Sequence, residues 1–227
     1  MCIRDRENTT GGQVLPPAYV AEVAQLARSR GLVMHLDGAR LFNAATANAA
    51  RHGTDVYDEA RSLCGHFDSV SLCLSKGLGA PIGSLVLGSR DFIRQARRTR
   101  KILGGGMRQA GVLAAAGHHA LDHHVRRLAD DHANLARLAQ GLSDLNQSHP
   151  ALQGKITVHP WQTNILFTDL HADVAPAFTA WLAEHGVRVT SSLYSGATRL
   201  RWVTHLDVSE ADVKAALDCV GRFRLPG

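Results

Sequence analysis

Residues 68–88 read DSVSLCLSKGLGAPIGSLVLG, and this stretch decides the fold. Val70, Leu72 and Leu74 alternate with polar residues, which is the period of a β-strand with one buried face. The run SLVLG at its end predicts a second strand, and a glycine-rich loop that contains Lys76 joins the two. A lysine after a strand is usually a surface group, but functional loops also gather at such strand ends. Lys76 is therefore either a surface charge or a nucleophile.

Helices and strands alternate around this stretch. Pro16 and Pro17 suit the start of a helix that Gly31 ends, and an apolar strand follows over residues 32–36. The alanine-rich run AATANAA predicts a short helix. A basic helix follows the SLVLG strand, and a long helical region then extends over about residues 109–145, with a break expected near Asp122. The alternation predicts an α/β fold with a mostly parallel sheet.

After residue 145 the pattern changes to short strands and amphipathic helices. Strands are expected in TNILFTDL, GVRVTS and RLRWVTHL. Helices are expected in APAFTAWLAEHG and in the last segment, where Ser209 and Asp212 can form a capping box. These elements indicate a small α+β domain. We place the domain boundary at the helix break expected near Asp122, which assigns residues 1–122 to a larger domain and residues 123–227 to the smaller one.

The composition narrows the classes of function. The net charge of +5 is concentrated in RQARRTRK, residues 94–101, which has no interleaved aromatic residue, so we interpret it as a solvated helix face or a subunit contact and not as a nucleic-acid site. No apolar segment could span a membrane. The four cysteines form no C-x-x-C pair, which fits a cytoplasmic protein. His119 and His123 share a helical face, but without a third ligand we expect no metal site.

Two charged residues at strand ends suggest a common chemistry. Asp37 and Lys76 each follow a predicted strand, and the carboxyl ends of parallel strands open onto one crevice. A pyridoxal phosphate enzyme needs a lysine that bonds covalently to the cofactor and a carboxylate that pairs with its ring nitrogen. Arg201 could bind the carboxylate of an amino-acid substrate bidentately. Arg199 shares its face, however, and alternation does not separate the two arginines.

The blocks ENTTGGQVLP, MHLDGARLFNAA, LCLSKGLGAPIGS, KILGGGMRQAGVLAAAG and RWVTHLDVS follow one another from Glu7 onward. They resemble successive blocks of low-specificity L-threonine aldolase, a pyridoxal phosphate-dependent family of fold type I. The resemblance covers nearly the whole chain, and SKGLGAP with GGGMRQAG is its most specific part. It implies cleavage of L-threonine or L-allo-threonine to glycine and an aldehyde.

The resemblance also implies roles for single residues. Lys76 matches the lysine that holds the cofactor, Asp37 the partner of the ring nitrogen, and Arg40 an arginine of the cofactor pocket. Arg201 matches the arginine that binds the substrate carboxylate. Two further basic residues match positions near active sites that form between the subunits of a homotetramer, where a structural interface role is equally open: Lys101 and Arg108.

The chain also departs from the family pattern. Residues 1–6 resemble no family segment and are interpreted as foreign sequence, and the family's phosphate-binding loop and its ring-stacking histidine belong upstream of Glu7. We therefore predict a truncated polypeptide that binds the cofactor weakly and has impaired activity. Two alternatives stay open: another fold-type-I lyase that β-eliminates amino acids, and a non-catalytic fragment that acts only in assembly.

Overall fold

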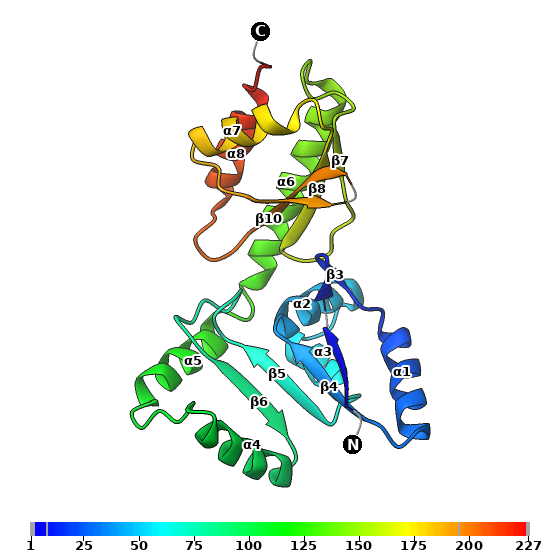
Figure 1. Ribbon diagram of the computed structural model, residues 1–227, viewed down its shortest axis with the longest axis vertical. Helices are drawn as coiled ribbons and strands as arrows, with labels where there is room; N and C mark the ends of the chain where they lie inside the picture. The colour runs from blue at the N-terminus through cyan, green and yellow to red at the C-terminus, as the bar shows by residue number, and fades with distance from the viewer. Residues whose placement is uncertain (1–2, 8, 195, 226–227) are drawn as a thin grey trace. The chain divides into compact units, whose positions relative to one another are not determined.

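The computed structural model describes residues 3–7, 9–194 and 196–225 (Figure 1). Helices alternate with a mostly parallel group of strands in the first part of the chain, and an antiparallel group of strands follows. Within the described ranges, no helix combines the length and the apolarity needed to cross a bilayer. The fold is α/β, as the sequence predicts.

Contacts within the backbone divide the chain into two compact units, which we describe separately. Unit 1 comprises the residues up to 10 and Val14–Leu128, and unit 2 comprises Gly11–Gln13 and the residues from Ala129 on. Gly12 explains the early piece of unit 2, because its carbonyl oxygen accepts hydrogen bonds from the backbone N–H groups of Gln162 and Thr163. The division lies after Leu128, whereas the sequence places it after residue 122. Two short strands that pair with each other lie on either side of Gly11 and Gly12: β2 (Thr9–Thr10) and β3 (Gln13–Val14).

Unit 1 contains a four-stranded sheet that is mostly parallel, as predicted. Strand β1 pairs with β4, and β4 with β5, in parallel, whereas β6 runs antiparallel to β5 at the edge. Residues 3–6 of the opening segment lie in β1, so their backbone extends the sheet beside β4. The strands are, in spatial order, β1 (Ile3–Glu7), β4 (Val33–Gly38), β5 (Ser69–Cys73) and β6 (Ser84–Gly88).

The helices of unit 1 follow the prediction except for one. Gly31 adopts a φ of +63° just after α1, and glycine takes this left-handed conformation without strain, so the predicted helix end is confirmed. Helix α3 was not predicted. It is capped by Asp55, whose side chain accepts a hydrogen bond of 2.8 Å from the backbone N–H of Tyr57. The helices are α1 (Pro17–Ser29), α2 (Leu41–His52), α3 (Val56–Cys64), α4 (Arg90–Ile102) and α5 (Gly111–His123).

One face of this sheet is apolar and buried. Val70, Leu72 and Leu74 all lie in the core, so the alternation that predicted β5 is confirmed. The polar positions between them face the other way, together with His35 of β4, whose Nδ1 lies 2.9 Å from Ser69 Oγ. The buried face packs against side chains of α2, α3 and α5: Leu41, Ala44, Val56, Ala60, Leu63 and Ala120.

Unit 2 contains an antiparallel four-stranded sheet and three further helices. The sheet has the order β7 (Ile156–Val158), β8 (Ile165–Leu170), β10 (Ala197–Val203) and β9 (Thr190–Tyr194). The helices are α6 (Leu128–Ser148), α7 (Ala175–Glu184) and α8 (Glu210–Gly221). The predicted capping box is confirmed, because the Ser209 side chain accepts from the Asp212 backbone and the Asp212 side chain from the Ser209 backbone.

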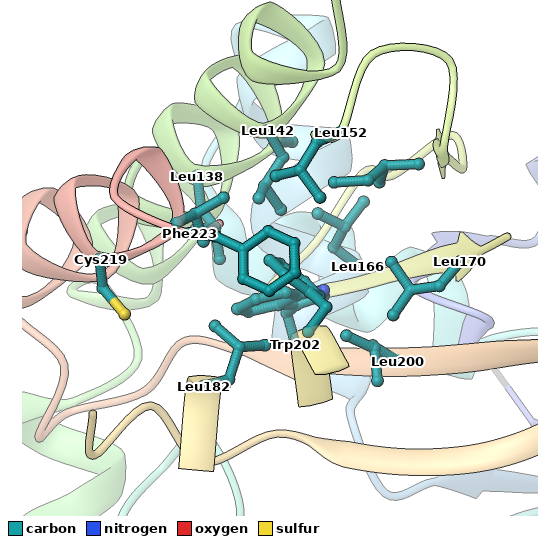
Figure 2. Packing of buried hydrophobic residues seen from close by; sticks show 14 of the residues in the cluster. Leu138, Leu142, Leu152, Leu166, Leu170, Leu182, Leu200, Trp202, Cys219 and Phe223 are labelled. Carbon is teal, nitrogen blue, oxygen red and sulfur yellow. The ribbon is translucent and has the colours of Figure 1, made fainter. Parts of the chain in front are cut away.

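The core of unit 2 lies between its sheet and its helices (Figure 2). Leu166, Leu200 and Trp202 of the strands point into the same cluster as Leu142 of α6 and Leu182 of α7, and all are buried. Trp202 also donates a hydrogen bond of 3.0 Å from Nε1 to the hydroxyl of Thr168, so its polar atom is satisfied inside the core. The other face of the sheet is therefore the one left for polar side chains.

The strand predicted in GVRVTS is wrong in its first part. Gly186 ends α7 with a φ of +78°, and the segment that follows has no regular structure until β9 begins at Thr190. Val187 and Val189 pack against the core of unit 2 from this irregular segment. Val187 and Val189 are thus partly buried without belonging to a strand. The alternation of these β-branched residues therefore gave a wrong strand prediction.

Candidate active site

Lys76 lies exposed in a loop that continues from the carboxyl end of β5. The loop is braced by its own backbone, because Ala80 N–H donates to Leu74 O at 3.0 Å and Gly79 N–H to Lys76 O at 2.9 Å. Gly77 is closely packed: a Cβ there would lie 2.9 Å from Leu128 Cδ2 and 3.1 Å from Asn43 Oδ1, so those side chains would have to shift. The glycine next to the lysine therefore serves close packing of the loop onto α2 and the start of α6.

Asp37 lies half-buried near the carboxyl end of β4, level with Ser71 of β5. Its Oδ1 accepts a hydrogen bond of 3.0 Å from the backbone N–H of Ala39, which fixes the turn that leads into α2. Because β4 and β5 are parallel neighbours, their carboxyl ends lie at one edge of the sheet. The fold thus brings Asp37 and the loop of Lys76 to the same edge.

Arg40 and the Lys76 loop line the same small pocket. Arg40 immediately precedes α2, and it lines a cavity of about 10 Å³ together with Cys73, Gly77 and Asn43. This volume is close to that of a single water molecule. Arg40 therefore lines the same pocket as Gly77, the residue that follows Lys76. Three of the sequence-predicted site residues, Lys76, Asp37 and Arg40, belong to unit 1.

Cys73 is a polar group of this region to which sequence reasoning gave no role at the site. Burial would raise the pKa of its thiol, but hydrogen bonds with Ser75 and Ser84 and the charge of Lys76 outweigh burial and lower the pKa. The lower pKa favours the reactive thiolate. The alternation in β5 was the signal in the sequence, because it places Cys73 on the same side of the strand as Ser71, the residue level with Asp37.

Arg201 lies in unit 2, on the polar face of the sheet. Its neighbour Arg199 is engaged by Asp169, whose two carboxylate oxygens accept from Nε at 2.6 Å and from an Nη at 2.8 Å. His159 Nε2 lies 2.8 Å from the same carboxylate. The hydrogen bond with Arg199 is the main cause that lowers the pKa of Asp169, and burial opposes it. Arg199 is therefore engaged by Asp169 within unit 2, and Arg201 lies on the same face of β10.

The two remaining predicted residues lie at the exposed end of α4 and in the exposed segment that leads from it to α5. Lys101 is in the last turn of α4, and its side chain lies against Gly106, where a Cβ would come within 2.7 Å of Lys101 Cδ. Arg108 is exposed ahead of α5. Ile102 and Leu103 in the same segment expose 72% and 79% of their surface. Exposed apolar residues of this kind mark contact surfaces.

The donor set of unit 1 suits pyridoxal phosphate chemistry. Lys76 offers an amine for the cofactor aldehyde, and Asp37 offers a carboxylate for a protonated ring nitrogen. Metal chemistry has less support: the rings of His119 and His123 are 4.5 Å apart, but the described part of the chain gathers no group of three side chains able to hold a metal ion.

Comparisons with known proteins agree with this geometry. A family model described as β-eliminating lyase matches residues 1–172. The chain is 39% identical over 224 residues to a probable low-specificity L-threonine aldolase 2 of Arabidopsis thaliana, covering 96% of the chain and 58% of that protein. It is 41% identical over 203 residues to the low specificity L-threonine aldolase of Escherichia coli strain K12, covering 89% of the chain and 54% of that protein. The chain thus spans little more than half the length of these relatives.

Solved structures show the same fold. A threonine aldolase of Leishmania major superposes with a TM-score of 0.77 at 19% identity, covering 97% of this chain and 60% of that one. A protein of Listeria monocytogenes described as a putative L-allo-threonine aldolase gives 0.73 at 17% identity, covering 96% and 60%. The fold of the chain is accordingly that of fold-type-I pyridoxal phosphate enzymes, as the sequence predicts.

Proposed function

This chain belongs to the β-eliminating lyase family, and we propose from that premise that it serves pyridoxal phosphate-dependent cleavage of L-threonine, L-allo-threonine and related β-hydroxy-α-amino acids to glycine and an aldehyde. One observation carries the proposal: the parallel pairing of β4 with β5 delivers Asp37 and the loop of Lys76 to one edge of the sheet. The relatives described as low-specificity L-threonine aldolases support the choice of reaction.

The residues of the chain divide the work of this reaction. Lys76 Nζ would bond covalently to the cofactor and yield its place to the amine of the substrate, after which its free amine can carry a proton. Asp37 would hold a proton on the ring nitrogen, and Arg40 would support the same pocket. When bound, pyridoxal phosphate supplies the electron sink that stabilises negative charge on the substrate's Cα.

Arg201 would orient the substrate. A guanidinium binds a carboxylate through two parallel hydrogen bonds. This pair of bonds fixes the orientation of the amino acid, and with it the direction of the bonds at Cα. The bond from Cα to Cβ must be held in one direction for it to break, and orientation of this kind can contribute several kcal/mol, up to about 7–11 kcal/mol, to catalysis. A base then removes the β-hydroxyl proton as the aldehyde leaves; we assign no residue to this role.

We also propose that the protein works in the cytoplasm as a homotetramer, with Lys101 and Arg108 near sites shared between subunits. The exposed apolar residues beside Lys101 support a subunit contact there. Free thiols at Cys64, Cys73 and Cys219 fit a reducing compartment.

Covalent labelling tests the proposed function directly. The purified chain is mixed with pyridoxal phosphate, reduced with borohydride and digested, and the modified lysine is identified by mass spectrometry. We expect the label on Lys76 and its loss in Lys76→Ala. Lys155→Ala is the control, because Lys155 lies in unit 2 and pairs with Asp173 at 2.6 Å. A folded, oligomeric chain without label on Lys76 would favour the role in assembly alone.

The matching family model favours one other enzymatic candidate. A β-eliminating lyase would use the same lysine, aspartate and arginine but release ammonia and a keto acid. Product analysis separates the two reactions: glycine and acetaldehyde from L-threonine support the aldolase, and ammonia with a keto acid supports the eliminating lyase.

A further inference from the structure

The loop that carries Lys76 has a side-chain clamp in addition to its own backbone bonds. His124 Nδ1 lies 2.6 Å from the carbonyl oxygen of Leu78, two residues after Lys76. A carbonyl oxygen only accepts, so Nδ1 carries the hydrogen of this bond. Leu78 itself is buried, and its side chain holds the middle of the loop in the core of unit 1. The hydrogen bond therefore acts on a segment that already has one fixed point.

His124 is itself held on a rigid support. It caps the end of α5, where its backbone N–H donates to Ala120 O at 2.9 Å, and Ala120, Val125 and Leu128 around it are fully buried. Its ring also meets the ring of His119 edge-on, with centroids 5.2 Å apart. The support and the ring contact together restrict where Nδ1 can point.

The same helix junction contacts the loop at a second point. Leu128 lies under Gly77, so close that a Cβ on Gly77 would come within 2.9 Å of its Cδ2. The segment from His124 to Leu128 thus holds Gly77 by packing and Leu78 by a hydrogen bond. These are the two residues that immediately follow Lys76, and fixing them limits the positions that the lysine backbone can take.

We infer that His124 is a positioning residue for Lys76: by donating from Nδ1 to Leu78 O, it holds the loop so that the lysine amine is presented at the sheet edge beside Asp37. This inference rests on the proposed function in one respect: the proposed function gives Lys76 its cofactor-binding role. Misplacement of a reactive group by a small distance lowers the rate of its reaction, because the reacting atoms must meet in one geometry.

Substitutions can separate the hydrogen bond from the bulk of the ring. The Nδ2 of asparagine stands where Nδ1 of histidine stands, whereas glutamine places its donor one bond further out. We therefore compare His124→Asn and His124→Gln, which are similar in polarity, with His124→Leu, which has no donor. His118→Leu is the matched control, since His118 is an exposed histidine of the same helix.

The first readout needs no cofactor. Hydrogen–deuterium exchange of peptides covering residues 74–83 should rise about three- to ten-fold in His124→Leu and His124→Gln, the range that one hydrogen bond supports. It should stay near the wild-type rate in His124→Asn and His118→Leu. Unchanged exchange in His124→Leu and His124→Gln would overturn the inference, whatever the chain does with pyridoxal phosphate.

The second readout is the rate at which Lys76 becomes labelled by pyridoxal phosphate and borohydride. We expect the labelling rates to rank the variants as the exchange rates do. His124→Asn should be labelled at close to the wild-type rate, and His124→Gln and His124→Leu about three- to ten-fold more slowly. Equal slowing in the Asn and Gln variants would also overturn the inference. If wild type is not labelled at all, the proposed function fails while the exchange measurement still judges the clamp. If His124→Leu does not fold, the comparison of Asn with Gln decides alone.

Discussion

Replacing Gly38 by alanine should destabilise unit 1, because the new methyl group has no room. Gly38 is the buried last residue of β4, and a Cβ there would lie 2.6 Å from the backbone oxygen of Ser71 and 3.1 Å from Val70 Cγ1. Ordinary C···O contacts are about 3.3–3.6 Å, so β5 must shift by roughly 0.7 Å or more. Such overpacking costs about 1–3 kcal/mol. Reduced freedom of the unfolded chain returns about 0.4–1 kcal/mol, which leaves a net loss of about 1.3 kcal/mol at the middle of both ranges.

Gly65→Ala is the control with the opposite expected sign. Gly65 follows α3 with a φ of −61° and a ψ of −14°, and the atoms nearest to a Cβ added there would be 3.5 Å away. Alanine fits this conformation, so the variant should gain about 0.4–1 kcal/mol. The three tryptophans all belong to unit 2, so unfolding of unit 1 is followed by urea-dependent hydrogen exchange of peptides from β4 and β5. The reasoning is refuted if Gly38→Ala is as stable as wild type.

Three further predictions concern single groups. Cys73 should be alkylated by iodoacetamide at pH 8 faster than Cys64. Hydrogen bonds lower the pKa of the Cys73 thiol against the effect of burial, whereas burial raises the pKa of the Cys64 thiol. Equal alkylation rates would contradict this. Asp169→Asn should cost about 1–2 kcal/mol through the lost ion pair with Arg199. Because the pKa of Asp169 is lowered in the folded state, urea titrations followed by tryptophan fluorescence should show that cost in full above about pH 4 and a smaller cost as the pH falls through the folded value. Ser209→Ala should destabilise α8 by about 1 kcal/mol in the same titration, and an unchanged midpoint would speak against the capping box.

The sequence predicted what depends on local periodicity. Strand β5 was found because a period of two places Val70 and Leu72 in the core, and the end of α1 was found because glycine can adopt the left-handed conformation. Helix α3 was missed because it is short and its clearest signal is a single capping residue, Asp55. The false strand around Val187 shows the converse, since local alternation cannot tell whether a partner strand will be there.

Long-range pairing decides what alternation leaves open, and the two arginines of β10 show how. Alternation puts Arg199 and Arg201 on one face and ranks neither, because both have the same type and the same exposure pattern. The register of β10 with β8 sets Asp169 opposite Arg199 and Phe167 opposite Arg201. A further carboxylate at Arg199 would have to displace the bidentate carboxylate of Asp169, which is already in place. A slip of the register by one residue would move Asp169 to the other face of the sheet. The engagement of Arg199 is therefore a property of the sheet, and no reading of the RLRWVTHL segment by itself could predict it.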